Sequence, residues 1–446
     1  MPIITDSTPV TFSDPLPEAV DVVIIGAGIV GTSTAWFLAQ HGAKVLLCEK
    51  GRVAGEQSSR NWGWVRQQGR DSAELPIMME ANRIWRDLAA SSGEKDLGFT
   101  PSGCVYLAET ERQLAKYESW YALARQHQLD TRMLSRDEAS ALAAHISGRW
   151  IGGMFTASDG RAEPFVAVPA MARAASKLGA VIIEDCAVRS VETQAGRVSG
   201  AVTEKGAVRT ACVLLAGGAW SSRFAANLGL DLPQLVVRST AGRTNSVSGK
   251  EMPNISMADF AIRSRDDGGY TIATGDVVEH YVSPQSFKYF TKFLALMKIS
   301  AKDVRVRLGP PCGYPGAWGA KRRWTGDQIS PFEEMRVLDP PPSEAVRRRL
   351  KRRLRKRAPW LEDVGIEELW AGMIDVTPDV VPYVCEVPAP GGLFIGTGMS
   401  GHGFGIGPGV GRILADLIQG RPPGHDLCRF RFERFSDGSP IVPGPY

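Results

Sequence analysis

A glycine-rich turn near the start of the chain constrains its fold more than any other feature. The run VVIIGAGIVG, which begins at Val22, is typical of a buried strand that enters a tight turn. Residues 32–41 then carry helical apolar spacing, and residues 44–50 form a second apolar strand. This order predicts a strand–helix–strand unit of the doubly wound type.

The spacing of the glycines indicates what this unit binds. Gly26 allows the tight turn, Gly28 lets a pyrophosphate approach the backbone, and Gly31 permits close packing of helix against strand. Glu49 ends the second strand 18 residues after Gly31, where an acid can bind ribose hydroxyls. We therefore expect a dinucleotide site, and the fingerprint alone leaves NAD and FAD open.

Length and charge narrow the class of protein. The 446 residues exceed what one hydrophobic core normally organises, so two domains are expected. The 52 basic residues barely outnumber the 48 acidic ones, and nine of the basic residues lie in 347–357. Val346, Leu350 and Leu354 share one face of a predicted helix there. Nucleic-acid binding is not expected from so local an excess.

Cysteines and termini suggest an intracellular protein. The seven cysteines are scattered without a CxxC pair, so neither a metal site nor a disulfide framework is expected. The first 20 residues lack the features of a signal peptide. No run reaches the roughly 20 apolar residues of a membrane helix. We expect a cytoplasmic protein without membrane association.

A second cluster of glycines lies near the C-terminus. Gly396, Gly398 and Gly401 match the same fingerprint, but no apolar strand ending in an acid follows. Seven glycines between 396 and 409 instead predict bare backbone beside a large planar group or an anion, ahead of a closing helix at 410–418.

Four motifs in fixed order carry a family resemblance. They are RVAGEQSSRNWGWVRQQGRD from Arg52, VLLAGGAW from Val213, LWAGMIDVTPDVVP from Leu369 and GHGFGIGPGVG from Gly401. From Asp21 onward the chain resembles the glycine oxidase/D-amino-acid oxidase (DAO) superfamily of FAD enzymes. Within it, the likeness is greatest to bacterial flavin L-amino-acid oxidases and L-amino-acid deaminases.

The resemblance implies an α/β (α+β) fold in which a Rossmann-like FAD-binding domain is interleaved with an antiparallel-sheet substrate domain. The expected FAD-binding parts are 20–75, 150–235 and 375–440. The expected substrate-domain parts are 76–149 and 236–374, the latter with an inserted segment at 284–342. This segment is expected to cover the active site or to contribute to a homodimer.

FAD is the cofactor that the resemblance implies, and its expected binding residues follow the motifs. In sarcosine-type relatives a Cys seven residues before the Asp of TPD attaches the flavin; here that Asp is Asp379 and the position holds Gly372. We therefore expect noncovalent FAD. The expected binding residues are Gly26, Gly28, Ile29, Val30, Gly31, Glu49, Lys50, Gly51, Gln57, Ser58, Ser59, Arg60, Asn61, Trp62, Gly63, Val188, Ala216, Gly217, Gly218, Trp220, Met373, Ser400, Gly401, His402, Gly403 and Phe404.

Substrate contacts are expected from other positions. An amino-acid carboxylate needs a fixed cation, and a planar arginine suits it best. The resemblance assigns this role to Arg263, with Arg265 on the same strand face. Other expected pocket residues are Arg66, Gln67, Gln68, Trp370 and His402, with Arg322 and Arg323 as weaker candidates; His402 is expected to act mainly through its backbone.

The expected activity is FAD-dependent oxidation of an L-amino acid, by hydride transfer from Cα to flavin N5, to a 2-oxo acid, ammonia and H2O2. O2 is the expected acceptor. A quinone-linked dehydrogenase or deaminase, an oxidase of D-amino or N-methyl amino acids, and a flavin-binding module without turnover remain alternatives. The sequence identifies neither the preferred side chain nor the oligomeric state.

Overall fold

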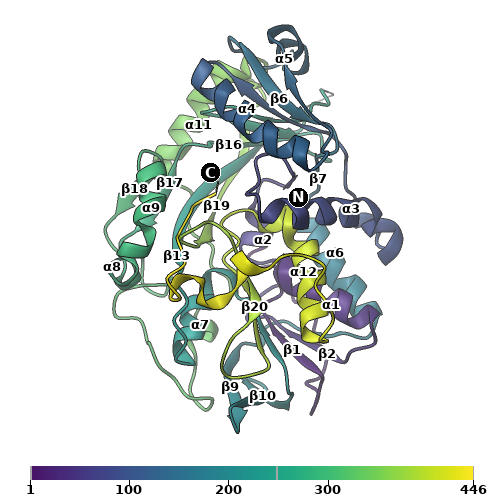
Figure 1. Cartoon of the computed structure of the whole chain (residues 1–446), viewed down its shortest axis with the longest axis vertical. Helices are drawn as coiled ribbons and strands as arrows, with labels where there is room; N and C mark the ends of the chain where they lie inside the picture. Colours follow the sequence, from purple (N-terminus) through teal and green to yellow (C-terminus); the bar gives the residue numbers. More distant parts are fainter. Residues whose placement is uncertain (1–2, 248–249, 445–446) are drawn as a thin grey trace.

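The computed structural model describes residues 3–247 and 250–444, which form two halves that each contain a large sheet (Figure 1). The halves are not consecutive in sequence, because the chain passes between them several times. Residues 152–156, which fall inside the expected FAD-binding part 150–235, pair with strands of the other half.

The first half is a six-stranded sheet in the order β20-β21-β12-β1-β2-β8. All neighbours are parallel except β20 and β21. Its strands are β1 Val22–Ile25, β2 Val45–Cys48, β8 Val181–Ile183, β12 Val213–Leu215, β20 Tyr383–Glu386 and β21 Leu393–Thr397. Their apolar runs are buried because layers cover both faces, as is usual for parallel sheets.

Helices α1 (Ile29–Gln40), α6 (Pro164–Lys177) and α12 (Gly403–Ile418) cover one face of this sheet. The small sheet of β9 (Val188–Gln194), β10 (Arg197–Thr203) and β11 (Gly206–Arg209) packs into the core on the other face. Strands β11 and β12 are close in sequence but belong to different sheets.

Part of the C-terminal glycine cluster is helical, because α12 begins at Gly403, ahead of the expected start at 410. Its glycines allow α12 to approach α1 closely. A Cβ atom at Gly407 would lie 2.5 Å from Ile29, and one at Gly411 would lie 2.4 Å from Ser33. The glycines of this cluster thus permit close packing of α12 against α1, and they also leave bare backbone ahead of the helix.

The second half is a ten-stranded sheet, ordered β18-β17-β13-β16-β15-β14-β4-β6-β5 with β19 paired to β13. Its strands are β4 Cys104–Ala108, β5 Thr131–Leu134, β6 Gly152–Thr156, β13 Leu235–Thr244, β14 Asn254–Ser256, β15 Ala261–Ser264, β16 Tyr270–Ala273, β17 Val278–Tyr281, β18 Val304–Arg307 and β19 Ile366–Val376. Helix α11 (Glu344–Arg357) buries Val346, Leu350 and Leu354, as its spacing predicts.

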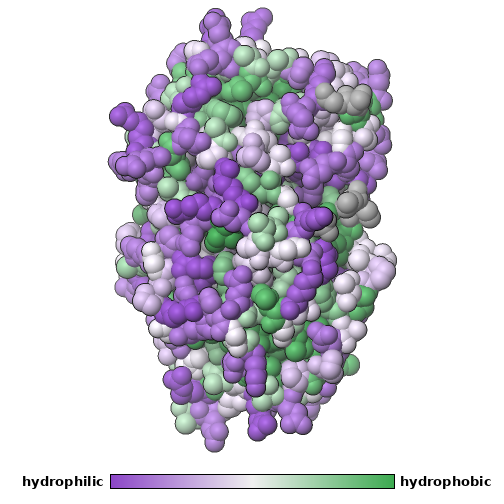
Figure 2. Space-filling model, turned by 90° about the vertical axis from the view of Figure 1, so that its right-hand side faces the viewer, coloured by the Kyte–Doolittle hydropathy of each residue, from purple (hydrophilic) through white to green (hydrophobic). Residues whose placement is uncertain are grey.

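Further helices and two short strands complete the fold. These are α2 Gln57–Arg60, β3 Trp64–Val65, α3 Glu74–Ser92, α4 Glu111–Gln126, α5 Arg136–Leu142, β7 Gly160–Arg161, α7 Ser221–Asn227, α8 Pro284–Lys288, α9 Phe290–Ser300 and α10 Pro331–Glu334. Within the described residues, no helix combines the length and apolar character needed to cross a bilayer. Figure 2 shows one flank of the molecule, where hydrophilic side chains surround smaller apolar areas.

Candidate active site

One large cavity, of about 1430 Å³, runs from the start of α1 to the inner face of the ten-stranded sheet. It brings together motifs that lie far apart in the sequence. Of the residues expected to bind FAD, those that line it are Gly26, Gly28, Ile29, Val30, Glu49, Lys50, Gln57, Ser58, Arg60, Asn61, Trp62, Val188, Ala216, Gly217, Gly218, Trp220, Ser400, Gly401, His402, Gly403 and Phe404.

The start of α1 forms one end of the cavity. Gly28 is the N-cap residue, so the positive end of the helix and its free amides face the cavity. Ser58 Oγ accepts a hydrogen bond from the Ile29 amide at 2.9 Å. A Cβ atom at Gly31 would lie 2.0 Å from the Gly26 carbonyl oxygen, so this glycine permits packing and does not line the cavity.

Glu49 lies at the end of β2, beside the glycine turn. Its carboxylate accepts hydrogen bonds from the Ala27 amide at 2.8 Å and from the Gly51 amide at 2.9 Å. Burial raises the pKa of Glu49 to about 7. Gly51 itself lies outside the cavity, where its bare backbone meets the Arg336 carbonyl. These hydrogen bonds fix the Glu49 carboxylate beside the glycine turn.

The loop after β2 is held from behind. Arg60 donates from Nη2 to the Ile4 carbonyl at 3.0 Å, and its own carbonyl accepts from Trp370 Nε1 at 2.8 Å. Trp370 is buried in a core cluster and does not line this cavity, so the expectation that it walls the pocket was wrong. Ser59 and Gly63 do not line the cavity either.

The structure also contradicts the role expected for Arg263. The side chain is almost fully buried outside the cavity. Its Nη1 and Nη2 donate to the two oxygens of Glu163 at 2.7 and 2.9 Å, and its Nε donates to the Trp62 carbonyl at 2.5 Å. In this arrangement the guanidinium is already paired with a carboxylate and does not line the cavity. Arg265 is likewise paired, with Asp267 at 2.8 Å.

The Arg263–Glu163 pair should instead stabilise the fold. We expect Arg263→Met to lower the free energy of unfolding by about 3–5 kcal/mol, because it removes the hydrogen-bonded partner of a buried carboxylate. Adding Glu163→Gln to Arg263→Met should restore most of the loss. Urea unfolding of parent, single and double variants measures this, and equal stability of the parent and Arg263→Met would contradict it.

The same pair predicts a pH dependence. Burial alone would raise the pKa of Glu163, but Arg263 and Arg265 lower it to about 2. An unfolded glutamate titrates near 4.3, so the folded pKa is depressed. The pair's contribution is therefore fully present above about pH 4.3 and is lost as the pH falls toward about 2. The difference between parent and double variant should shrink over that range.

Arg66, after β3, and Arg70, just beyond it, do line the cavity. Arg70 Nε donates to the Arg66 backbone carbonyl at 3.2 Å, which ties the Arg70 side chain to the loop that carries Arg66. Arg70 Nη1 is buried and has no hydrogen-bond partner among the described residues. Burial and the charge of Arg66 lower the pKa of Arg70 to about 10, so it remains a cation at neutral pH. This wall of the cavity suits an anion.

His402 lies at the N-terminus of α12, next to this wall. Its Nδ1 lies 3.2 Å from the carboxylate of the buried Glu74, which can only accept, so Nδ1 carries the proton. Burial and the charge of Arg70 lower the pKa of His402 to about 4. The imidazole is therefore neutral near pH 7 and a poor proton acceptor.

Two further expected residues point elsewhere, and several lining residues were missed. Gln68 is buried and accepts from Thr156 Oγ1 at 2.9 Å, and Met373, on β19, packs into the core. Residues that line the cavity but were not expected include Trp64, Arg70, Tyr106, Tyr117, Trp120, Ser239, Ala241, Thr274 and Ile374. Trp64 lies within the NWGWV motif, which could have indicated it.

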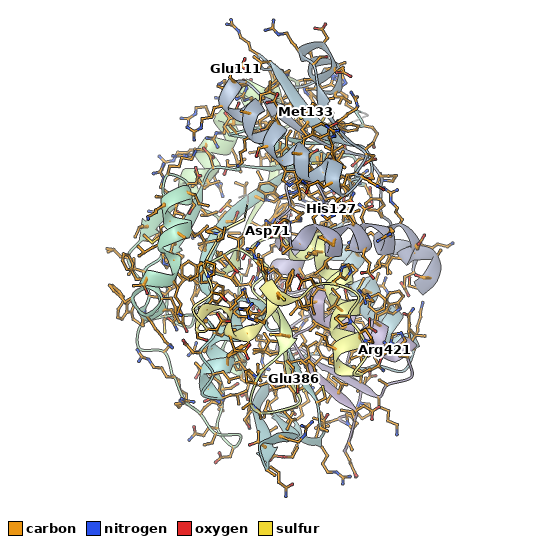
Figure 3. All side chains as sticks on the ribbon, viewed as in Figure 1. Asp71, Glu111, His127, Met133, Glu386 and Arg421 are labelled. Atoms are coloured by element: carbon orange, nitrogen blue, oxygen red, sulfur yellow. The ribbon has the colours of Figure 1, made fainter. Side chains whose placement is uncertain are left out.

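The outer part of the cavity is bordered by segments from three regions. Asp71, labelled in Figure 3, pairs with Arg429 at 2.8 Å and so ties the C-terminal segment to the cavity. Lys302 and Phe332, from the segment expected as an insertion, also border it. Arg322 and Arg323 do not line the cavity; they are exposed on the surface.

The residues present fit FAD. The cavity joins a helix N-terminus with a glycine cradle, where a Cβ atom at Gly28 would lie 3.0 Å from Ser58 Oγ, to an acid at the end of β2. A phosphate, a ribose and a planar ring system can each find suitable partners along it. The ring would lie between the loop of Trp62 and Trp64 and the start of α12.

The comparisons with known proteins agree with this geometry. The structure superposes on that of the L-amino acid deaminase from Proteus myxofaciens with a TM-score of 0.91 and 30% identity, covering 97% of both chains. Glycine oxidase from Geobacillus kaustophilus is 23% identical in sequence over 93% of this chain and 97% of its own. Its fold superposes with a TM-score of 0.76.

Human sarcosine dehydrogenase is 25% identical over 94% of this chain, but the chain spans only 42% of that protein's length. The family model of FAD dependent oxidoreductases, DAO, matches residues 21–417. This match covers the strand–helix–strand unit, the loop at 52–71 and α12, which together build the cavity. The chain is a member of the DAO family of FAD-dependent oxidoreductases.

Proposed function

We propose that the protein oxidises the CH–NH2 group of L-amino acids, with noncovalently bound FAD. The observation that carries the proposal is the pair of arginines on the cavity wall, where Arg70 Nη1 has no partner among the described residues. A buried donor without an acceptor is costly, and an anion bound in the cavity would supply the acceptor. The α-carboxylate of an amino acid is such an anion.

Each cavity residue then has a role that its chemistry allows. Arg66 and Arg70 bind the α-carboxylate, and planar guanidiniums fix its orientation as well as its position. Trp64 and Tyr106, which also line the cavity, leave an apolar and aromatic space for a side chain. When bound, FAD supplies the acceptor for the two electrons and the hydrogen that leave Cα.

The protonation states of His402 and Glu74 are compatible with a substrate that reacts as the neutral amine. With a pKa of about 4, His402 stays neutral and adds no positive charge beside the substrate nitrogen. Glu74 lies behind His402, and although burial would raise its pKa, His402 and Arg70 hold it below the ordinary value. The carboxylate therefore orients the imidazole and balances the arginines.

Relatives support both this proposal and its nearest rival. The deaminase structure from Proteus myxofaciens was obtained in complex with anthranilate, a planar amino-carboxylate. Other relatives are glycine oxidases and sarcosine dehydrogenases, which points to small or N-methylated amines. O2 is the acceptor we propose, with a quinone as the alternative.

An anaerobic substrate screen tests the proposal. We expect L-amino acids with apolar or aromatic side chains to bleach the FAD absorption at 450 nm roughly tenfold or more faster than their D-enantiomers, glycine or sarcosine, because the carboxylate clamp fixes one face of Cα. Admission of air should then yield peroxide. If only glycine or sarcosine reduced the FAD, the substrate would be a small or N-methylated amine. If no amine reduced it, the protein would not be an amine-oxidising enzyme.

A further inference from the structure

The segment that follows β18 reaches from the second half of the fold to the nucleotide end of the cavity. The chain leaves the ten-stranded sheet after Arg307 and passes beside α7 (Figure 1), where the Trp324 amide donates to Asn227 Oδ1 at 3.0 Å. It then forms α10 and returns to the second half at α11. We call residues 324–339 the cap segment.

The cap segment adds an aromatic side chain to the wall of the cavity. Phe332 lines the cavity together with Trp220 and Phe224, and its ring centroid lies 5.9 and 5.8 Å from theirs. The centroid of the Trp220 ring lies 4.6 Å from the Nζ atom of Lys50, which directly follows Glu49. The three rings therefore form an aromatic wall close to the end of β2.

One flank of the cap segment is attached to β9, next to a residue that lines the cavity. Val188 lines the cavity, and the carbonyl of the following residue, Arg189, accepts from Trp324 Nε1 at 2.7 Å. The Arg189 guanidinium donates to the two carboxylate oxygens of Glu333 at 3.0 and 2.7 Å. Burial would raise the pKa of Glu333, but hydrogen bonds from Arg189 and Ser330 lower it to about 2. The ion pair is therefore charged at neutral pH.

The other flank of the cap segment is attached to the residues that follow β2. Lys50 Nζ donates to the carbonyls of Met335 and Arg336, at 2.8 Å in each case. A Cβ atom at Gly51 would lie 2.2 Å from the Arg336 carbonyl oxygen, so the two backbones pack directly against each other. Phe332 is thus held in place from both sides, by β9 and by the loop after Glu49.

We propose that the cap segment completes the adenine subsite of the FAD cavity, with Phe332 as the aromatic contact of the adenine ring. The acid at the end of the second strand binds the ribose in this type of fold, so the attached adenine lies beside Glu49. Val188 and Phe332 border the cavity on this side, and aromatic side chains stack on the rings of nucleobases. Because the cap segment comes from the second half, both halves hold the cofactor. This role does not depend on which substrate is oxidised.

The rate at which the loaded protein releases FAD tests this role, and flavin fluorescence after dilution measures that rate. We expect Phe332→Ala to release FAD roughly tenfold or more faster than the parent, because the contact between ring and base is removed. Phe332→Leu keeps most of the apolar volume, so it should fold like the parent and still release FAD roughly threefold faster. FMN lacks the adenosine half of FAD, so parent and variants loaded with FMN should release it at rates within about twofold of one another.

Phe287→Ala is the matched control. Phe287 lies in the same connection between β17 and α11, but it is 67% exposed and does not line the cavity. This variant should release FAD within about twofold of the parent rate. Two results would overturn the proposal: release of FAD at the parent rate by both Phe332 variants, or equal acceleration of FAD and FMN release. The second result would show that Phe332 maintains the shape of the whole cavity and does not contact the adenine.

Discussion

Gly28→Val protein is expected to purify folded but colourless, with FAD content below roughly a tenth of the parent's. The reason is steric, because even a Cβ atom at this position lies 3.0 Å from Ser58 Oγ. A valine would occupy the space that the pyrophosphate needs and displace the hydroxyl that accepts from the Ile29 amide. The absorbance ratio at 450 and 280 nm measures the loss.

Gly98→Val is the matched control. Gly98 is exposed and outside the cavity, and its Cβ would approach nothing closer than the Lys95 carbonyl at 3.8 Å. This variant should keep its FAD, and acid precipitation should release that FAD into the supernatant as it does from the parent. Normal flavin content in Gly28→Val would show that the phosphates bind elsewhere, and flavin retained in the acid precipitate would refute noncovalent attachment.

The nucleotide-binding end of the cavity could be predicted from the local sequence pattern. The strand, the glycine turn, the helix and Glu49 are consecutive, so their geometry follows from backbone rules that act over about 30 residues. The buried face of α11 could be predicted for the same reason, because Val346, Leu350 and Leu354 lie on one side of a single helix.

The amino-acid end of the cavity could not be predicted in this way. Its walls come from alternate residues of strands that pair only in the folded protein, such as Ser239 on β13 beside Gly372 on β19. Arg263 was misassigned because its partner, Glu163, lies 100 residues away. A strand pattern indicates that a side chain faces inward. It does not indicate whether an oppositely charged side chain from a distant part of the sequence lies beside it.

The glycine cluster of α12 shows a third limit. Glycine lowers helix propensity, so the sequence predicts a helix only from 410, after the glycine-rich stretch. Here close contact with Ile29 and Ser33 of α1 outweighs that propensity, because only a bare backbone fits between the two helices. Propensity was overridden by packing that the sequence of α12 alone does not contain.

Arg66→Ala should keep its FAD but lose roughly 30- to 3000-fold in kcat/KM for the best L-amino acid. Removing one partner of a buried charge pair costs roughly 2–5 kcal/mol, and every 1.4 kcal/mol is a tenfold change. The substrate carboxylate would retain only Arg70, whose Nε already donates to the Arg66 carbonyl. The loss should appear in the rate of FAD reduction as well as in KM, because the same contact orients Cα.

Two comparisons distinguish a carboxylate site at Arg66 and Arg70 from the site at Arg263 that the sequence analysis favoured. Arg66→Lys should recover only part of the rate, since an ammonium cannot reproduce the planar fork of a guanidinium. The double variant Arg263→Met with Glu163→Gln removes the other inward-facing arginine together with its counter-ion, and should keep kcat/KM within about threefold because neither side chain lines the cavity. If the double variant loses FAD reduction while Arg66→Ala retains it, the carboxylate must bind at Arg263, and the Arg263–Glu163 pair must open when substrate enters.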